Sequence, residues 1–303
     1  MARMIDSLRV NGFRATGRFT EYMKEGGEGM LGGFVETVMY DSVPIVADNV
    51  VDTYMESKNT ALVGMPSLMP PFPITWIEAR FGGQAFGVLY MMDDDASIAI
   101  ALLFLLDKRD GIVHGPLIQI DLPLDERGYF DAAASTKHSR KADNYQDLSD
   151  YFGKGRSEDY TLLMKDFTSE EDGIDLDHGA SMEFVKIAML AVGLMNCSNV
   201  GTVEVTPPPK LSKKRRKRYG IPLTTYRVIR VGPHLTTRGK KHSDESYVEG
   251  DAALPKHLIR GHFKTYEADR PLMGKHTGTF WWKAQVRGSK SAGEVRHEYE
   301  VEQ

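Results

Sequence analysis

Three residues near the C-terminus have the types and spacing that phosphodiester chemistry needs. In His257-x-x-Arg260-Gly261-His262, imidazoles can transfer protons near neutral pH, and a guanidinium can hold a phosphate on which negative charge develops. A strand over 257–266 would place His257 on the face opposite His262, unless a bulge forms at Gly261. A metal-independent ribonuclease or phosphodiesterase using His262, Arg260 and His257 is therefore an alternative, and a phosphate-binding or structural role is the main expectation.

Six consecutive cations, Lys213 to Arg218, make nucleic acid the expected partner. Such a run repels itself, and contacts with phosphates relieve this repulsion and release condensed counterions. A solvated loop, a targeting signal and a contact with anionic membranes are the competing interpretations. Two expected strands, over 257–266 and 280–287, would each add a charged face, because side chains alternate along a strand. The predicted nucleic-acid-binding residues are Lys213, Lys214, Arg215, Arg216, Lys217, Arg218, Arg260, Lys264, Trp281, Lys283 and Arg287.

The two strand faces favour one kind of nucleic acid. Cations, a histidine and the Trp281 indole form the mixture that holds a phosphate backbone and stacks an unpaired base. No signature of a recognition helix appears. RNA or single-stranded DNA is therefore expected in preference to a duplex read by sequence.

The charges of the chain are divided between two regions. Residues 1–206 hold 17 Lys and Arg against 32 Asp and Glu, a net charge of −15, whereas residues 207–303 hold 21 against 10, a net charge of +11. Such a division predicts an acidic body, 1–206, and a basic module, 207–303, that faces a polyanion. The boundary is expected at Pro207-Pro208-Pro209, because three prolines form a stiff extended connector.

Composition excludes several classes of protein. With 41% hydrophobic residues and a net charge of −4, the chain is not disordered. The longest uncharged apolar run, Ser97 to Leu106, has about half the length of a membrane span, and Asp6 comes before any signal peptide could form. No membrane contact and a cytoplasmic location are expected. A single cysteine, Cys197, excludes a disulfide framework, and we expect neither a metal site nor a cofactor.

The expected fold class is α+β: an antiparallel β-meander with several helices, plus the basic, β-rich C-terminal module. Short apolar runs joined by Gly and Asp residues predict the meander between 74 and 122, and Asp93-Asp94-Asp95 is interpreted as a solvated turn rather than a cation site. Apolar stripes predict helices over 43–55 and 179–196. The Gly-rich first forty residues predict a mobile arm or a short hairpin.

The stretch Thr206 to Ile229, the His257-x-x-Arg260-Gly261-His262-Phe263 segment and Gly278 to Gly288 together resemble a C-terminal module of uncharacterised proteins of tailed bacteriophages and prophages. The likeness covers roughly the last hundred residues. It implies a viral or mobile-element origin and a host cytoplasm, and it brings no established activity. We expect a phage-encoded nucleic-acid-binding protein rather than an enzyme. Besides the nuclease, a host-takeover inhibitor or virion component that acts through protein–protein contacts is an alternative.

Overall fold

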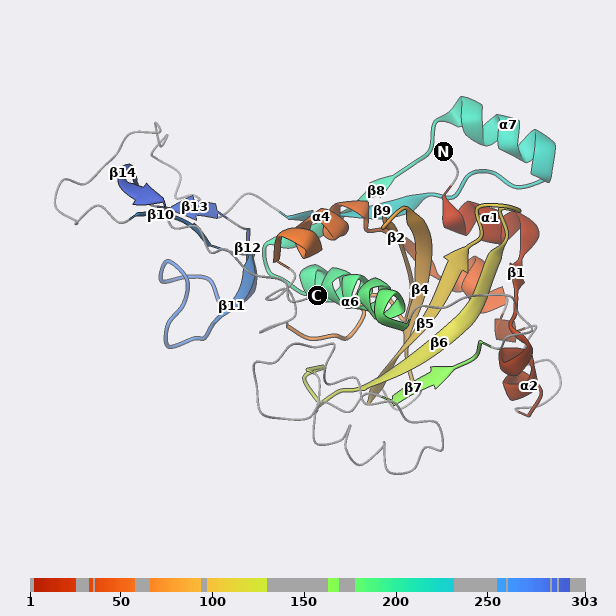
Figure 1. Cartoon of the computed structure of the whole chain (residues 1–303), viewed down its shortest axis with the longest axis horizontal. Helices are drawn as coiled ribbons and strands as arrows, with labels where there is room; N and C mark the ends of the chain where they lie inside the picture. The colour runs from red at the N-terminus through yellow and green to blue at the C-terminus, as the bar shows by residue number, and fades with distance from the viewer. Residues whose placement is uncertain are drawn as a thin grey trace.

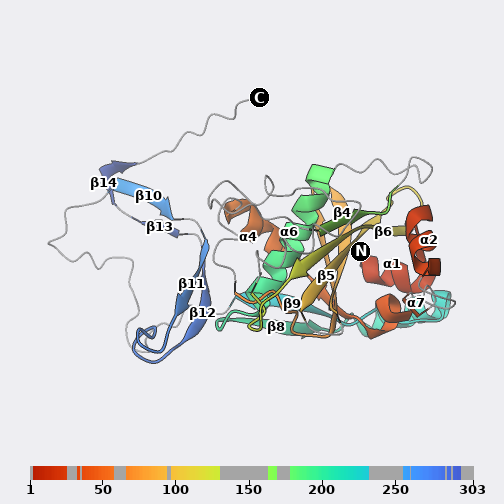
Figure 2. The same ribbon diagram turned by 90° about the horizontal axis from the view of Figure 1, so that it is seen from below.

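A computed structural model gives the fold of the chain (Figures 1 and 2). It describes residues 3–25, 33–34, 36–57, 66–93, 97–129, 163–168, 178–231, 255–259, 261–283, 285–287 and 289–294. Helices and a mixed sheet share one body, so the predicted α+β class is confirmed.

A nine-stranded mixed sheet, the central sheet, forms the middle layer. Its strand order is β1-β6-β5-β4-β3-β2-β9-β8, and β7 pairs with β6. The strands are β1 Phe13–Arg14, β2 Val43–Val46, β3 Ile74–Phe81, β4 Gln84–Met92, β5 Ile98–Leu106, β6 Val113–Pro123, β7 Leu163–Asp166, β8 Val200–Val205 and β9 Tyr226–Val231. β3 to β6 pair antiparallel in chain order, which confirms the predicted meander. β2 is parallel to both β3 and β9.

The turns of the meander follow from turn chemistry. Phe81 pairs with Gln84, so Gly82 and Gly83 make a two-residue hairpin loop. Their φ angles are 57° and 77°, in the left-handed region that a tight hairpin requires and that glycine adopts without strain. At the next turn the Asp93 carboxylate accepts the N–H groups of the first residues of the returning strand. Asp94 and Asp95 lie outside the described residues.

Helices cover both faces of the central sheet. α1 Met4–Asn11, α2 Gly17–Glu25 and the π-helix η1 Thr37–Asp41 lie on one face, and α4 Asp48–Ser57 and α6 His178–Met195 lie on the other (Figure 2). Neighbouring residues of one strand therefore enter different cores: Trp76 packs with the α1 side and Ile77 with the α6 side. Burial on both faces explains the nearly continuous apolar runs of β3 to β6. The helix predicted over 179–196 is confirmed as α6.

One prediction near the N-terminus is wrong, and a second is confirmed only in part. The first forty residues contain helices α1 and α2, because apolar side chains such as Ile5, Leu8 and Phe19 face the sheet at helical spacing. The expected helix over 43–55 is strand β2 followed by helix α4. Valines at 43, 46 and 50 have helical spacing, but residues 43–46 pair in parallel with β3 and β9 and are covered on both faces of the sheet, so no alternation marks the strand.

The C-terminal strands form two smaller sheets. They are β10 Pro255–Ile259, β11 His262–Tyr266, β12 Gly278–Trp282, β13 Gln285–Arg287 and β14 Ser289–Glu294. β10 pairs with β13 and β14, whereas β11 pairs with β12 as an antiparallel hairpin. The single strands expected over 257–266 and 280–287 are thus each divided between the two sheets. The first break includes Gly261, a residue type that weakens a strand and permits a bend.

The predicted boundary after residue 206 falls inside the central sheet. Val205 pairs with Tyr226, and the antiparallel register continues from there along β8 and β9. β9 also pairs with β2. Residues 207–225 are therefore a long excursion between two paired strands, and they contain helix α7 Pro209–Tyr219. The folding of residues 207–303 as one unit is still a prediction.

Candidate nucleic-acid interface

The run of six cations lies on helix α7. Pro209 stands in its first turn, where its fixed φ favours a helix and its missing N–H is not needed. Gly220 ends the helix at φ 80°, and its N–H donates to the Arg216 carbonyl oxygen at 2.9 Å. Cations fill the last turn and face the negative end of the helix dipole. Local sequence thus accounts for both ends of α7.

The cations of α7 form one broad arc. Successive helical residues are about 100° apart around the axis. Six cations consequently cover about 200° of the circumference: Lys210, Lys213, Lys214, Arg216, Lys217 and Arg218. All six are exposed, and no residue of the helix is buried. We call this surface the α7 arc.

The opposite side of α7 attaches the helix to the body. The Arg215 guanidinium donates a hydrogen bond to the backbone oxygen of Asp6 in α1, and its Cζ lies 5.4 Å from the ring centroid of Tyr219. The buried Asp6 carboxylate accepts the N–H of Thr224 at 2.9 Å, just after the helix. Arg9 of α1 donates to the Thr224 hydroxyl at 3.1 Å. Helix α7 is therefore attached to α1 from its middle, through Arg215, and from the segment after its C-terminal end, through Thr224.

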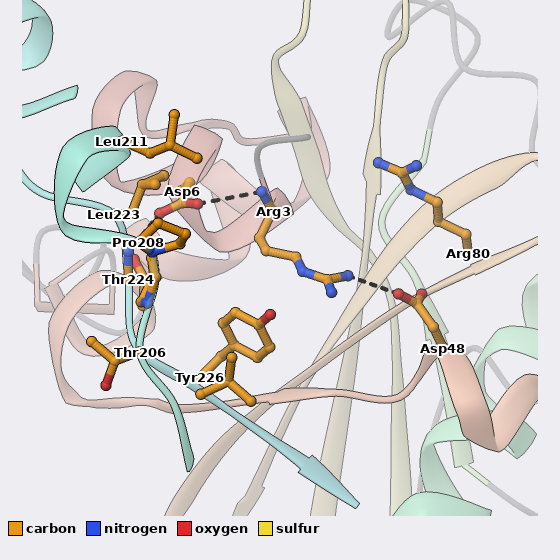
Figure 3. A pocket seen from close by; sticks show the side chains of 12 residues that line it. Arg3, Asp6, Asp48, Arg80, Thr206, Pro208, Leu211, Leu223, Thr224 and Tyr226 are labelled. Atoms are coloured by element: carbon orange, nitrogen blue, oxygen red, sulfur yellow. Dashed lines mark hydrogen bonds and ion pairs between the residues drawn. The ribbon is translucent and has the colours of Figure 1, made fainter. Parts of the chain in front are cut away.

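A cavity of about 380 Å³ adjoins the start of α7. Figure 3 shows Arg3 reaching across it toward Asp48, with Arg80 on the same side as Asp48. The Arg3 guanidinium donates to an Asp48 carboxylate oxygen at 2.7 Å and lies 5.0 Å from the Tyr226 ring centroid. Burial lowers the pKa of Arg3, but hydrogen bonds to Asp48 and Tyr226 outweigh it, so the net pKa is raised. The cavity at the start of α7 thus carries two further cations, Arg3 and Arg80, together with the carboxylates of Asp6 and Asp48.

A buried glutamate of the sheet holds α1, and so indirectly α7. The Glu78 carboxylate accepts the N–H groups of Met4 and Ile5 at 3.3 and 2.8 Å, and the Trp76 indole N–H at 3.1 Å. These bonds satisfy two of the N–H groups that a helix leaves unpaired at its start. Burial raises the pKa of Glu78, although the hydrogen bonds and the nearby Arg3 oppose this.

The base-stacking role predicted for Trp281 is wrong. Trp281 is only 1% exposed, and its ring packs edge-on against Phe263 with centroids 4.7 Å apart. The Asn199 side chain exchanges two hydrogen bonds of 2.9 Å with the Trp281 backbone. Phe280, on the other face of β12, is buried as well. Alternation along this strand suggested one solvated face, but packing against the body and within the hairpin covers both.

His262 and Lys264 share one face of β11, as predicted, with Phe263 on the other. His262 is half-buried and pairs across the hairpin with Trp282. Lys264 is exposed, and its Nζ lies 4.9 Å from the Tyr266 ring centroid. Lys283 is also exposed.

The side chains of three predicted residues, His257, Arg260 and Arg287, are not among those that the structure describes. His257 of β10 pairs in register with Arg287 of β13, but their side chains are not described. Arg260 lies outside the described residues. The acid–base group of His262, Arg260 and His257 is therefore still a prediction.

The two sets of predicted binding residues do not converge. Helix α7 lies at one end of the molecule, and strands β10 to β14 lie at the other, in both Figure 1 and Figure 2. Sequence analysis missed Lys210, which the helical register of 209–219 would have revealed. It also missed Arg3 and Arg80, which no local pattern connects to α7.

Comparison with protein-family models, with curated proteins and with solved structures finds no match to this chain. Among the described residues, no helix combines the length and apolar character that crossing a membrane requires.

Proposed function

We propose that the chain binds nucleic acid through the α7 arc, by contacts with phosphates rather than with bases. The observation that supports this most directly is the arrangement of six exposed cations on a helix whose opposite side is fixed to the body. The arc lacks the Asn and Gln side chains that read adenine, and its Lys and Arg side chains serve phosphates as well as guanine edges. We therefore expect little dependence of binding on sequence.

The magnitude of the charge supports the proposal. An α-helix of 11 residues is about 16 Å long, and that length of duplex carries about nine phosphates. Three like-charged pairs lie four residues apart, and each costs the free helix a few tenths of a kcal/mol: Lys210–Lys214, Lys213–Lys217 and Lys214–Arg218. Neutralising phosphates relieve this cost and release counterions.

The buried position of Trp281 alters the choice of nucleic acid. The stacking argument for single strands rested partly on that indole, and backbone contacts are available on RNA and DNA, paired or unpaired. We therefore propose a ligand defined by its phosphate backbone. An origin in a phage or prophage, as the C-terminal likeness implies, would place this activity in a host cytoplasm.

The test replaces four cations of the arc, Lys213, Lys214, Lys217 and Arg218, by Gln. Gln has nearly the helix propensity of Lys and Arg, so α7 should persist. The matched control replaces four exposed cations elsewhere, Lys24, Lys108, Arg127 and Lys275, by Gln. Both variants lose the same net charge.

The readout is the slope of log affinity against log salt concentration, for labelled duplex DNA and for a single strand. Each lost contact should reduce the slope by about 0.9 on a duplex and about 0.7 on a single strand. The control should keep most of the wild-type slope. Equal slopes for the arc variant and the wild type would overturn the proposal.

A further inference from the structure

A second polar cluster lies in the turn between β5 and β6, separate from α7. A ring nitrogen of His114 and one carboxylate oxygen each of Asp107 and Asp110 all lie within 4.8 Å of one another. Two carboxylates and an imidazole are a common ligand set for divalent transition metals. The turn thus brings three potential ligands together within the eight residues Asp107 to His114.

Backbone hydrogen bonds fix the two carboxylates. Asp107 accepts the N–H of Arg109 at 2.7 Å, and Asp110 accepts the N–H of Ile112 at 2.8 Å, each through Oδ1. These bonds hold each side chain close to the turn, while a carboxylate retains a second oxygen that can bind a metal. Such side-chain bonds to the backbone also stabilise turns that bind no ion. A buried polar group without a partner is a separate indication of a ligand.

His114 provides that observation. His114 is the second residue of β6, and its side chain is only 8% exposed. Among the described residues, its Nε2 is buried without a hydrogen-bond partner. A buried polar atom without a partner is costly and therefore uncommon in folded proteins. Here it belongs to the side chain that approaches the two aspartates.

We propose that Asp107, Asp110 and His114 bind a divalent transition-metal ion such as Zn²⁺ or Mn²⁺. Ligands about 2.1 Å from a tetrahedral Zn²⁺ lie about 3.4 Å apart, so atoms that lie within 4.8 Å of one another need to approach by at most about 1.4 Å. The imidazole favours these ions over Mg²⁺ and Ca²⁺, which prefer oxygen ligands alone. Three protein ligands leave a coordination position for water.

One neighbouring charge competes with the metal. A guanidinium nitrogen of Arg14 lies 3.8 Å from Asp110 Oδ2. The side chains of Arg14 and Asp110 are 60% and 37% exposed, so water screens their attraction. A divalent ion in direct contact with two carboxylates therefore displaces the guanidinium.

The experiment titrates untagged, chelator-treated protein with Co²⁺, Zn²⁺ and Mg²⁺. Calorimetry gives stoichiometry and affinity, and the visible spectrum of Co²⁺ reports nitrogen coordination. We expect one equivalent of Co²⁺ or Zn²⁺ to bind, and Mg²⁺ to bind at least tenfold more weakly. Asp107→Asn and Asp110→Asn should each weaken Zn²⁺ binding at least tenfold.

Asp125→Asn is the matched control. Asp125 Oδ1 accepts the N–H of Arg127 at 2.9 Å, the same kind of turn bond, at a distance from the cluster. This variant should bind Zn²⁺ like the wild type. His114→Gln should abolish the Co²⁺ spectrum, and if it fails to fold, the two Asp variants still carry the test. Absence of saturable binding, or equal affinity in Asp107→Asn, Asp110→Asn and the wild type, would refute the site.

Discussion

Helix α7 and the β11–β12 hairpin lie at opposite ends of the molecule and carry their cations in different ways. The helix has no buried residue, and its attachment depends on Arg215 and on the Asp6–Thr224 contact. The hairpin buries Phe263 and Trp281 and is bound to the body through Asn199. Cations of α7 are thus available for ligands, whereas the aromatic residues of the hairpin are committed to the fold.

Charged and packed side chains therefore contribute to different properties, the first to binding and the second to stability. A side chain without packing partners can be changed with little effect on folding, and its loss is seen in binding. A buried aromatic residue shows the opposite behaviour. Three substitutions can test whether the two regions divide in this way.

The largest effect is expected from Trp281→Ala. Removing a fully buried indole should lower the free energy of unfolding by about 3–5 kcal/mol, as the lost contacts and the cavity require. Urea denaturation measures this. Lys264→Ala, on the exposed face of the same hairpin, should change it by less than about 0.5 kcal/mol. Loss of nucleic-acid affinity with unchanged stability in Trp281→Ala would restore the stacking role and break the comparison.

A smaller effect is expected from Gly220→Ala. The left-handed φ of 80° costs a non-glycine residue about 1 kcal/mol. The last turn of α7 should therefore fray, and amide hydrogen exchange there should accelerate severalfold. Gly17→Ala, a helical glycine with open space around it, is the control and should not accelerate exchange in α2. Unchanged exchange at Arg216 to Tyr219 would show that the cap does not hold α7.

The smallest effect is a pH dependence from Glu78. Because its folded pKa is raised, its contribution to stability is fully present below the pKa of an unfolded carboxyl, about 4.3, and is lost as pH rises through the folded pKa. Glu78→Gln removes the ionisable group and with it this pH-dependent contribution to stability. The stability of the wild type minus that of Glu78→Gln should therefore fall as the pH rises from about 4, the region of the unfolded pKa.

Urea denaturation at constant ionic strength across this range checks the prediction. A difference that is constant, or that grows with pH, would contradict the raised pKa. Since Glu78 caps α1, which carries α7, the same series should affect protection of α7 amides more than those of the hairpin.

Sequence by itself determined the elements whose signals are local. The meander follows from apolar runs and the Gly82-Gly83 turn, α6 from an unbroken apolar stripe, and the charge of α7 from six adjacent cations. These signals depend on neighbours within a few residues, which is the range over which propensity and periodicity act. They established the α+β class and where the cations lie in the chain.

Only the tertiary structure decided what is exposed and what is brought together. Period-two alternation around Trp281 cannot reveal that both faces of β12 are covered, and valines at 43 to 51 fit a helix until two parallel neighbours pair with β2. Arg3 and Arg80 reach the surroundings of α7 through sheet pairing and helix packing between segments far apart in the chain. Burial and long-range pairing are properties of the whole packed chain, so no local pattern encodes them.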